Sequence, residues 1–271
     1  MRLNIRHHTV YRYGTPVCAS IQYLRLTPRN DPGQRVINWT VRASGDLQAW
    51  RDGYGNRVHT LACRKDYREL SIEAAGTIET YAAVIHLDGR EEILPNQVYL
   101  RHTPLTAADE AIRQFAGLFR VAVASAPLDA LLELMLAIRE RVAFTVGCTH
   151  SATSASEAFA GRSGVCQDHT HIFIACCRDL GIPARYIGGY LLVDDNSENQ
   201  TAGHAWAEAW IADIGWVSFD VANARHRCDT HVRVAVGLDY RDVSPVVGVR
   251  RGGGVEEMSV SVSVAVQADL A

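Results

Sequence analysis

The apolar residues of this 271-residue chain change their spacing twice, and this change limits the folds that the chain can adopt. From residue 1 to about 100 they form short alternating runs, such as "LNIRHHTVYRYG" and "SIQYLRLTPR", separated by turn formers. From 106 to 182 they recur every three or four residues, as in amphipathic helices, and from 184 to 221 they alternate again. The pattern predicts an α+β protein in which an N-terminal antiparallel β-sandwich precedes helices and a second group of strands.

Local signals indicate where the predicted elements begin and end. Helix starts are indicated at Thr106 with Asp109, at Pro127, and at Ser154 with Glu157. The helix that follows residue 166 should end at Gly181 and Pro183. The tail "VEEMSVSVSVAVQ" alternates regularly and follows the glycines at 252–254, so it predicts a terminal strand after a turn.

Composition excludes several classes of protein. Charged residues make up 21% of the chain, the formal net charge is −3, and no run of Lys or Arg is present, so nucleic acid is not an expected partner. The N-terminus lacks an apolar signal core and no stretch approaches ~18 uninterrupted apolar residues, so we expect a cytoplasmic protein without a membrane segment. The seven cysteines are scattered and form no C-x-x-C pair, which predicts reduced thiols and no common structural zinc site.

The segment "GRSGVCQDHTH" places a cysteine at the start of a predicted helix. Gly164 allows a tight entry into that helix, so Cys166 should lie in its first turn. The free N–H groups and the helix dipole at such a position favour a thiolate, and they can also hold a developing oxyanion. Cys176 and Cys177 fall in the middle of the same helix, so we interpret them as core residues.

A thiolate nucleophile needs a base, and the base needs an orienting group. In "GHAWAEAWIADIGWVSFDVAN", His204 and Glu208 point to one face of a predicted strand. The residues 213–215 predict a hairpin turn, and the returning strand can bring Asp220 beside His204. The chain therefore offers a cysteine, a histidine and an aspartate in the order found in papain-like sites.

Three short motifs give this chain a resemblance to a known family. G-V-C-Q-D around Cys166, H-A-W at His204 and G-W-x-x-F-D ending at Asp220 have the order and spacing of the bacterial transglutaminase-like superfamily, whose members are also described as candidate cysteine proteases. Residues 1–100 resemble the β-rich region that precedes the core in that family. The resemblance implies a β-sandwich domain at 1–100 and a papain-like catalytic domain, with helices on an antiparallel sheet, at 101–271.

Carried over to this sequence, the resemblance implies a catalytic role for each of the three motif residues. Cys166 would be the nucleophile, His204 the general base and acid, and Asp220 the orienter, with an acyl-thioester intermediate. Four neighbours are candidate substrate-cleft residues, namely Gln167, Asp168, His169 and Trp206. Relatives often have an aromatic residue two positions after the phenylalanine of an upstream strand, where this chain has Val146 after Phe144, so its substrate preference is expected to differ.

The same three residues serve two outcomes, hydrolysis by a peptidase or amidase and transfer of the acyl group to an amine. We expect hydrolysis, because no acidic cluster near Cys166 is placed to bind a lysine ammonium. Peptides, proteins and small amides are all possible substrates. A non-catalytic binding module and a metal hydrolase are the alternatives from other classes, and the oligomeric state is left open.

No cofactor or metal ligand is assigned from the sequence. Asp168, His169 and His171 could suggest a metal site, but residues two positions apart diverge on a helix. The run "DDNSEN" at 194–199 could bind calcium, as some transglutaminases do, but it lacks the spacing of an EF-hand and is interpreted as a solvated hairpin loop. Four further histidines receive no role, namely His7, His8, His226 and His231.

Overall fold

The computed structural model describes residues 1–81, 93–193, 203–226 and 229–267. The strands are β1 (Arg2–Thr27), β2 (Gln34–Ala43), β3 (Asp46–Arg51), β4 (Arg57–Cys63), β5 (Tyr67–Thr80), β6 (Ala143–Phe144), β7 (Ser163–Gly164), β8 (Ala184–Leu191), β9 (His204–Ile211), β10 (Gly215–Phe219), β11 (His231–Gly237), β12 (Val246–Gly252) and β13 (Glu256–Val266). The helices are η1 (Asn96–Leu100), α1 (Glu110–Gly117), α2 (Arg120–Ser125), α3 (Pro127–Arg141), α4 (Ala155–Gly161), α5 (Cys166–Asp179) and α6 (Tyr240–Val243). The predicted α+β fold class is confirmed. The run at 194–199 and Cys228 lie outside the described residues.

The N-terminal strands belong to one large antiparallel sheet with the order β2-β5-β1-β4-β3. Its long strand β1 serves two sets of partners, because residues 3–12 lie between β5 and β13 while residues 20–24 lie between β4 and β12. The alternating run at 3–14 and the first eight residues of the run at 20–29 are therefore parts of a single strand, which changes its register with β5 between Arg12 and Val17.

The end of the chain completes the same sheet. β12 and β13 both pair antiparallel with β1, which makes the sheet seven-stranded. The turn between them contains Gly252, Gly253 and Gly254, all with φ between 60° and 98°, a region that favours glycine. The predicted terminal strand is confirmed as β13. The division of the chain at residue 100 stays a prediction, since strands from both sides of it share this sheet.

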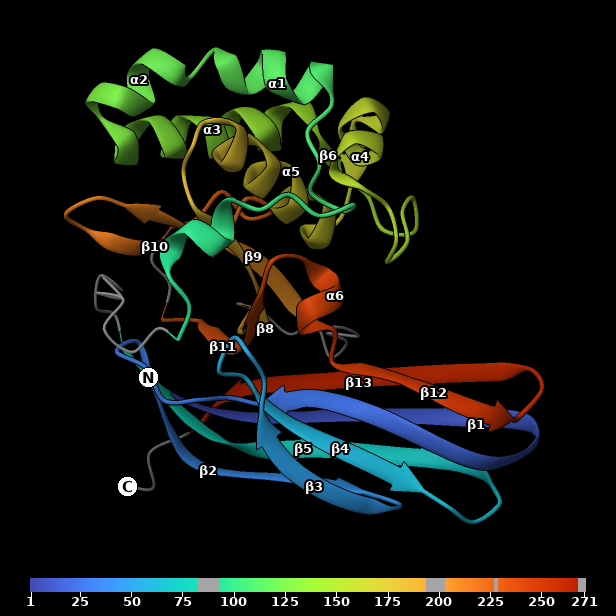
Figure 1. The fold of residues 1–271 in the computed structure, drawn as a ribbon. Coiled ribbons are helices and arrows are strands. Elements are labelled where there is room, and N and C mark those ends of the chain that lie inside the picture. The colour runs from blue at the N-terminus through green and yellow to red at the C-terminus, as the bar shows by residue number, and fades with distance from the viewer. Residues whose placement is uncertain (82–92, 194–202, 227–228, 268–271) are drawn as a thin grey trace.

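The second half of the chain is built around α5. All residues of α5 from 168 to 178 are buried. The helix packs against β9 on one side and against α1, α3 and α4 on the other. The smaller sheet has the order β10-β9-β8-β11. Figure 1 shows helices α1 to α5 on one face of this sheet and the large sheet beyond its other face. Among the described residues, no helix is long and apolar enough to cross a membrane.

The predicted helix starts are confirmed at two positions and shifted at the third. α3 begins at Pro127, and Ser154 and Glu157 form the capping box of α4. α1 begins at Glu110, because the Asp109 side chain accepts a hydrogen bond of 2.9 Å from the N–H of Ile112. Thr106, expected to be the cap, is instead buried and accepts a hydrogen bond of 2.6 Å from Arg178.

Candidate active site

Cys166 is the first residue of α5, as the sequence predicts. The entry into the helix is held by Asp168, whose Oδ2 accepts hydrogen bonds from the N–H of Val165 at 2.8 Å and from Thr149 Oγ1 at 2.7 Å. A Cβ atom on Gly164 would lie 2.6 Å from the Cβ of Asp168, so this close packing requires glycine. Asp168 therefore fixes the position of Cys166 from within the core.

The thiol of Cys166 differs from its neighbours in exposure. It is half-buried, whereas Cys176 and Cys177 are completely buried, and burial raises the pKa of both buried thiols. Because Cys166 opens the helix, its N–H has no carbonyl acceptor within the helix. That N–H is therefore available to stabilise an oxyanion on an acyl group bonded to the Sγ of Cys166.

His204 and Asp220 are brought together by two paired strands. β9 and β10 are joined by a turn at 212–214, in which Asp213 has a φ of 66°, and Phe219 pairs with Ala207. His204 opens β9 and Asp220 follows β10, so the two side chains meet, with 2.8 Å between His204 Nε2 and Asp220 Oδ2. The other ring nitrogen of His204, Nδ1, is then left to exchange a proton with the thiol.

The electrostatics of this pair favour an imidazolium. Burial lowers the pKa of His204, but the hydrogen bonds and charges of Asp220 and Cys166 outweigh burial and raise the pKa to about 10. Burial likewise opposes ionisation of Asp220, yet His204 and His231 hold its pKa well below the usual range. Asp220 is therefore a carboxylate that stabilises a positive charge on His204.

Asp220 has two further partners that sequence reasoning did not assign. His231, at the start of β11, places its Nε2 2.9 Å from Asp220 Oδ2, and Asn223 donates its side-chain N–H to the same oxygen at 2.7 Å. Asn223 lies three residues after Asp220, so a local turn could have indicated it. His231 arrives through the pairing of β11 with β8, for which the sequence near Asp220 contains no signal.

Among the described residues, His204, Asp220 and His231 form a group that could hold a metal ion. Their ligand atoms all lie within 4.8 Å of one another. Both imidazoles, however, are within hydrogen-bond distance of one Asp220 oxygen. Hydrogen bonding between the three groups accounts for the arrangement without an ion.

Cys166 and His204 line one cleft of about 260 Å³, which lies between the smaller sheet and the large sheet. Of the candidate cleft residues, Gln167 lines it and the other three do not. Asp168 is buried at the helix entry, and His169 is enclosed between the carbonyl oxygens of Val165 and Val142, at 2.9 and 2.8 Å. The ring of His169 also stacks on Phe144.

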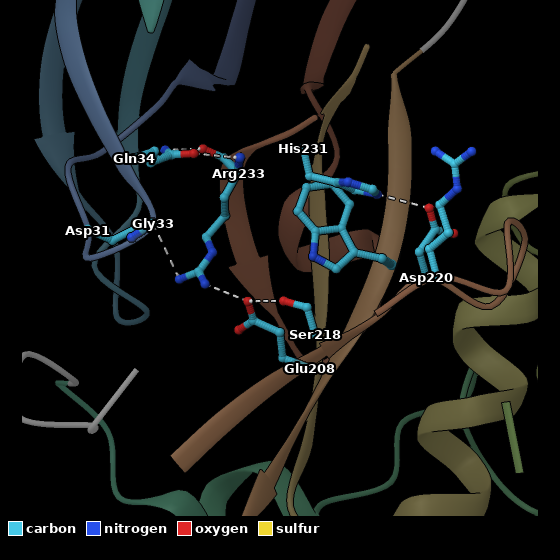
Figure 2. Close-up of a pocket in the computed structure, with 10 residues that line it drawn as sticks. Asp31, Gly33, Gln34, Glu208, Ser218, Asp220, His231 and Arg233 are labelled. Atoms are coloured by element: carbon cyan, nitrogen blue, oxygen red, sulfur yellow. Dashed lines mark hydrogen bonds and ion pairs between the residues drawn. The ribbon is translucent and has the colours of Figure 1, made fainter. Parts of the chain in front are cut away.

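Trp206 does not line the cleft but packs against two histidines. Its side chain packs against the rings of both His204 and His231, with centroids 6.0 and 4.9 Å away. It also lines a small second pocket that reaches Asp220 and His231 (Figure 2). Trp206 thus contacts both imidazoles from outside the cleft.

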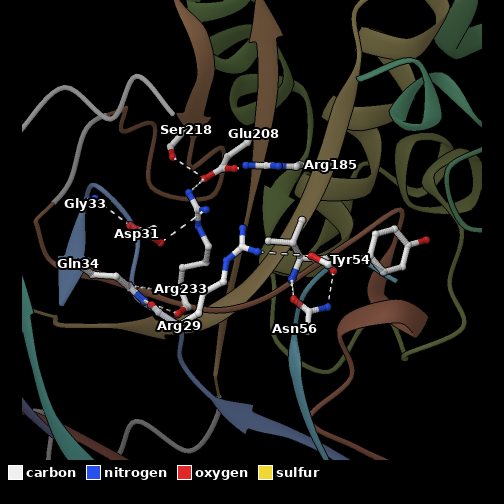
Figure 3. A network of polar contacts seen from close by, with 11 residues as sticks. Arg29, Asp31, Gly33, Gln34, Tyr54, Asn56, Arg185, Glu208, Ser218 and Arg233 are labelled. Atoms are coloured by element: carbon white, nitrogen blue, oxygen red, sulfur yellow. Dashed lines mark hydrogen bonds and ion pairs between the residues drawn. The ribbon is translucent and has the colours of Figure 1, made fainter. Parts of the chain in front are cut away.

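Glu208 belongs to a buried network of ion pairs. Its carboxylate accepts a hydrogen bond of 2.7 Å from Arg185 Nε, and its other oxygen is paired with Arg233 (Figure 3). Burial opposes ionisation of Glu208, but Arg233 and Arg185 outweigh it and lower its pKa. The network extends to the large sheet, because the side-chain amide of Gln34 makes two hydrogen bonds of 2.8 Å with the backbone of Arg233. These contacts fix β11, and with it His231, against the N-terminal part of the chain.

Comparisons with known proteins agree with this architecture. The sequence matches the transglutaminase-like superfamily over residues 118–221 and the bacterial transglutaminase-like N-terminal region over residues 3–79. An uncharacterized protein of Mycobacterium leprae is 28% identical over 285 residues, covering 97% of this chain and 98% of that protein. An uncharacterized protein of Mycobacterium tuberculosis is 29% identical over 279 residues, covering 92% of this chain and 87% of that protein. The crystal structure of a candidate cysteine protease from Cytophaga hutchinsonii shares the fold, with a TM-score of 0.75, 21% identity, and coverage of 100% of this chain and 92% of that one.

Proposed function

Because this chain belongs to the transglutaminase-like superfamily, with the bacterial N-terminal region before its core, we propose that it hydrolyses amide bonds through a thioester on Cys166. The substrates are peptides, proteins or small amides. Cysteine-based acyl chemistry is common to this class of fold, and the proposal adds the three residues that perform it and the acceptor of the acyl group.

One observation carries the proposal, namely the 2.8 Å contact between His204 Nε2 and Asp220 Oδ2 beside a cysteine that opens a helix. An imidazole held in this way has one orientation and leaves one nitrogen for Cys166, which lines the same cleft. A nucleophile, a base and an orienting carboxylate in contact are the requirements for nucleophilic catalysis.

In the first half of the reaction the Sγ of Cys166, as a thiolate, attacks the amide carbonyl carbon and forms the C–S bond. The carbonyl oxygen becomes an oxyanion, which the N–H of Cys166 stabilises. The imidazolium of His204 donates its proton to the amide nitrogen, the C–N bond breaks, and the amine leaves. Asp220 lowers the energy of the imidazolium that exists before this transfer.

In the second half a water molecule attacks the thioester while neutral His204 accepts one of its protons. The C–O bond forms, the C–S bond breaks, and the carboxylic acid leaves. The proton on His204 and the thiolate on Cys166 restore the starting charge pair. Each proton therefore moves through the single nitrogen of His204 that Asp220 does not hold.

Hydrolysis is favoured over amine transfer by the composition of the cleft. Among the described residues that line it, none is acidic, so a lysine ammonium would find no partner there. Glu208, the carboxylate that shares a strand face with His204, is buried between two arginines and does not reach the cleft. Amine transfer is the second candidate, since the same acyl-enzyme serves it.

A labelling experiment with thiol-reactive probes tests whether Cys166 is the nucleophile. Peptide and amide probes with an electrophilic carbonyl are added to the protein, and the labelled residue is identified by mass mapping. The expected result is a single label on Cys166, absent from the Cys166→Ser variant and strongly reduced in His204→Gln. A protein that leaves every probe unreacted while binding amides would instead be a binding module. Activity that survives Cys166→Ser and is lost with a chelator would indicate a metal hydrolase.

A further inference from the structure

The large sheet contributes part of the candidate active-site cleft. Arg25 and Leu26, near the end of β1, line the same cleft as Cys166 and His204. This part of β1 is held in place by β12, with Leu24 paired to Val246 and the N–H of Arg25 donating to the carbonyl of Pro245 at 2.9 Å. The cleft is therefore formed only when the N-terminal sheet packs on the catalytic sheet.

Arg25 is held at one nitrogen and has free donors at the others. Its Nε donates to Asp52 Oδ2 at 3.3 Å, and the side chain is 15% exposed. Within the part of the chain that the structure describes, its two terminal nitrogens donate to no protein group. The other carboxylate oxygen of Asp52 accepts hydrogen bonds from the N–H groups of Tyr54 and Asn56, so Arg25 is one of several partners of this carboxylate. The guanidinium is thus oriented by Asp52 while its outer edge stays available.

Among the described residues that line the cleft, Arg25 is the charged group besides the reacting pair. Of the described lining residues none is acidic, and most are apolar, glycine or aromatic. His7 is neutral, because burial and the neighbouring His8 lower its pKa to about 4, and both its ring nitrogens are bonded, to Tyr190 and Thr9 at 3.0 Å. A guanidinium with free N–H groups in an otherwise apolar cleft is a binding site for a carboxylate, which matches its paired donors.

The geometry points to an acyl donor that bears a carboxylate, bound by Arg25, with its amide carbonyl presented to Cys166. This inference rests on the proposed function for its reaction and adds the class of substrate, a small amide with a second, anionic end. The volume of about 260 Å³ is slightly below the usual range for small-molecule sites, so the buried part of the substrate is small. Arg25 is a specificity-determining residue contributed by the N-terminal region.

Binding to an inactive variant tests the inference separately from catalysis. Succinamic, glutaramic and adipamic acids, which cover a range of lengths, are compared with their neutral diamides by calorimetry on Cys166→Ala. We expect one of the acids to bind at least about tenfold tighter than its diamide, the range expected for a charge-assisted hydrogen-bonded pair. The preference should disappear in Cys166→Ala/Arg25→Gln. Arg12→Gln is the matched control, because Arg12 is also on β1 and pairs with exposed Glu69 away from the cleft.

A variant with the opposite effect sharpens the test. Asp52→Asn keeps an acceptor for the N–H groups of Tyr54 and Asn56 but removes the charge that competes for Arg25, so the acid should bind tighter and the diamide should not change. Equal binding of acid and diamide, no binding of either, or a preference that survives Arg25→Gln would each overturn the inference. If the acid preference depends on Arg25 and the wild-type protein still cleaves no amide, the proposed hydrolysis fails while the carboxylate site stands.

Discussion

His204 Nε2 and Asp220 Oδ2 lie 2.8 Å apart although the two residues are 16 positions apart in the chain. The contact depends on a tight turn between β9 and β10 and orients the ring so that only Nδ1 remains for the thiol. The orientation of the imidazole is therefore a property of two paired strands. The chemistry proposed for Cys166 depends on that rigid pair.

Asp220→Asn should leave the fold intact and reduce turnover by about 10⁴, the size of effect seen when a triad aspartate is replaced by asparagine. An asparagine has nearly the same shape, but it cannot stabilise an imidazolium on His204. The measurement is kcat/KM together with the unfolding midpoint of the variant. A folded variant with the wild-type rate would remove Asp220 from the mechanism.

Cys166 should be the first thiol to react with a limiting amount of iodoacetamide at mildly acidic pH. It is paired with His204 at a helix start, whereas the raised pKa values of Cys176 and Cys177 keep those buried thiols protonated. Peptide mass mapping gives the distribution of the label. The informative competitors are the exposed Cys18 and Cys148, and equal labelling of these with Cys166 would contradict a catalytic thiolate.

Glu208→Gln should destabilise the protein by about 3–5 kcal/mol, because it removes the negative charge that two buried guanidinium groups share, while Arg233 keeps Asp31 at 3.6 Å. Arg185 and Glu208 are both almost completely buried, and Arg233 connects the network to the N-terminal sheet. Urea unfolding measures the loss. Glu69→Gln, which removes the exposed partner of Arg12, is the control and should change the free energy of unfolding little. Equal effects of the two variants would show that the buried network adds nothing to stability.

Stability should fall as the pH drops below about 6.5, in part because of His171. Burial and the nearby Arg178 lower the pKa of His171 to about 3, against the partial opposition of Asp239. In the unfolded chain the pKa is near 6.5, so between these values the unfolded state binds a proton that the folded state does not. The stabilisation is complete above pH 6.5 and is lost by up to ~1.4 kcal/mol per pH unit as the pH falls.

His171→Gln keeps an acceptor for the N–H of Tyr240, which donates to His171 at 3.2 Å, and it removes the titration. Its free energy of unfolding, measured in urea between pH 7 and pH 4, should depend less steeply on pH than that of the wild type. The dependence should not vanish, because His7 titrates in the same sense. Parallel curves for the two proteins would exclude His171 as a source of the acid sensitivity.

The sequence predicts the parts of the site that depend on local structure. Cys166 was placed by a glycine before a helix, and His204 and Asp220 by two alternating runs around a turn, all of which are short-range signals. Gly164 shows why such a signal works, since the packing of Asp168 against it permits no side chain. Elements whose geometry is decided within about twenty residues were therefore predictable from pattern alone.

The parts that were not predicted depend on pairing between distant segments. His231 reaches Asp220 because β11 pairs with β8, and Arg25 reaches the cleft because β1 pairs with β12. The start of α1 differs from the prediction for a similar reason, because Thr106 accepts a hydrogen bond from Arg178, which lies 72 positions later in the chain. Periodicity indicates which face of a strand is apolar, but it does not specify which strand lies next to it.

Water should outcompete amines for the acyl-enzyme even at millimolar amine. An acceptor amine gains reactivity only if the protein holds it near the thioester, and a bound ammonium needs a carboxylate to hold it. Among the described residues that line the cleft none is acidic, and Arg25 would repel a cationic acceptor. The test is the partitioning of a carboxylate-bearing ester substrate between acid and amide products as the concentration of a primary amine rises. We expect acid to dominate, with amide increasing only linearly with amine. Amide product that dominates and saturates with amine would make the Cys166–His204–Asp220 triad that of a transferase.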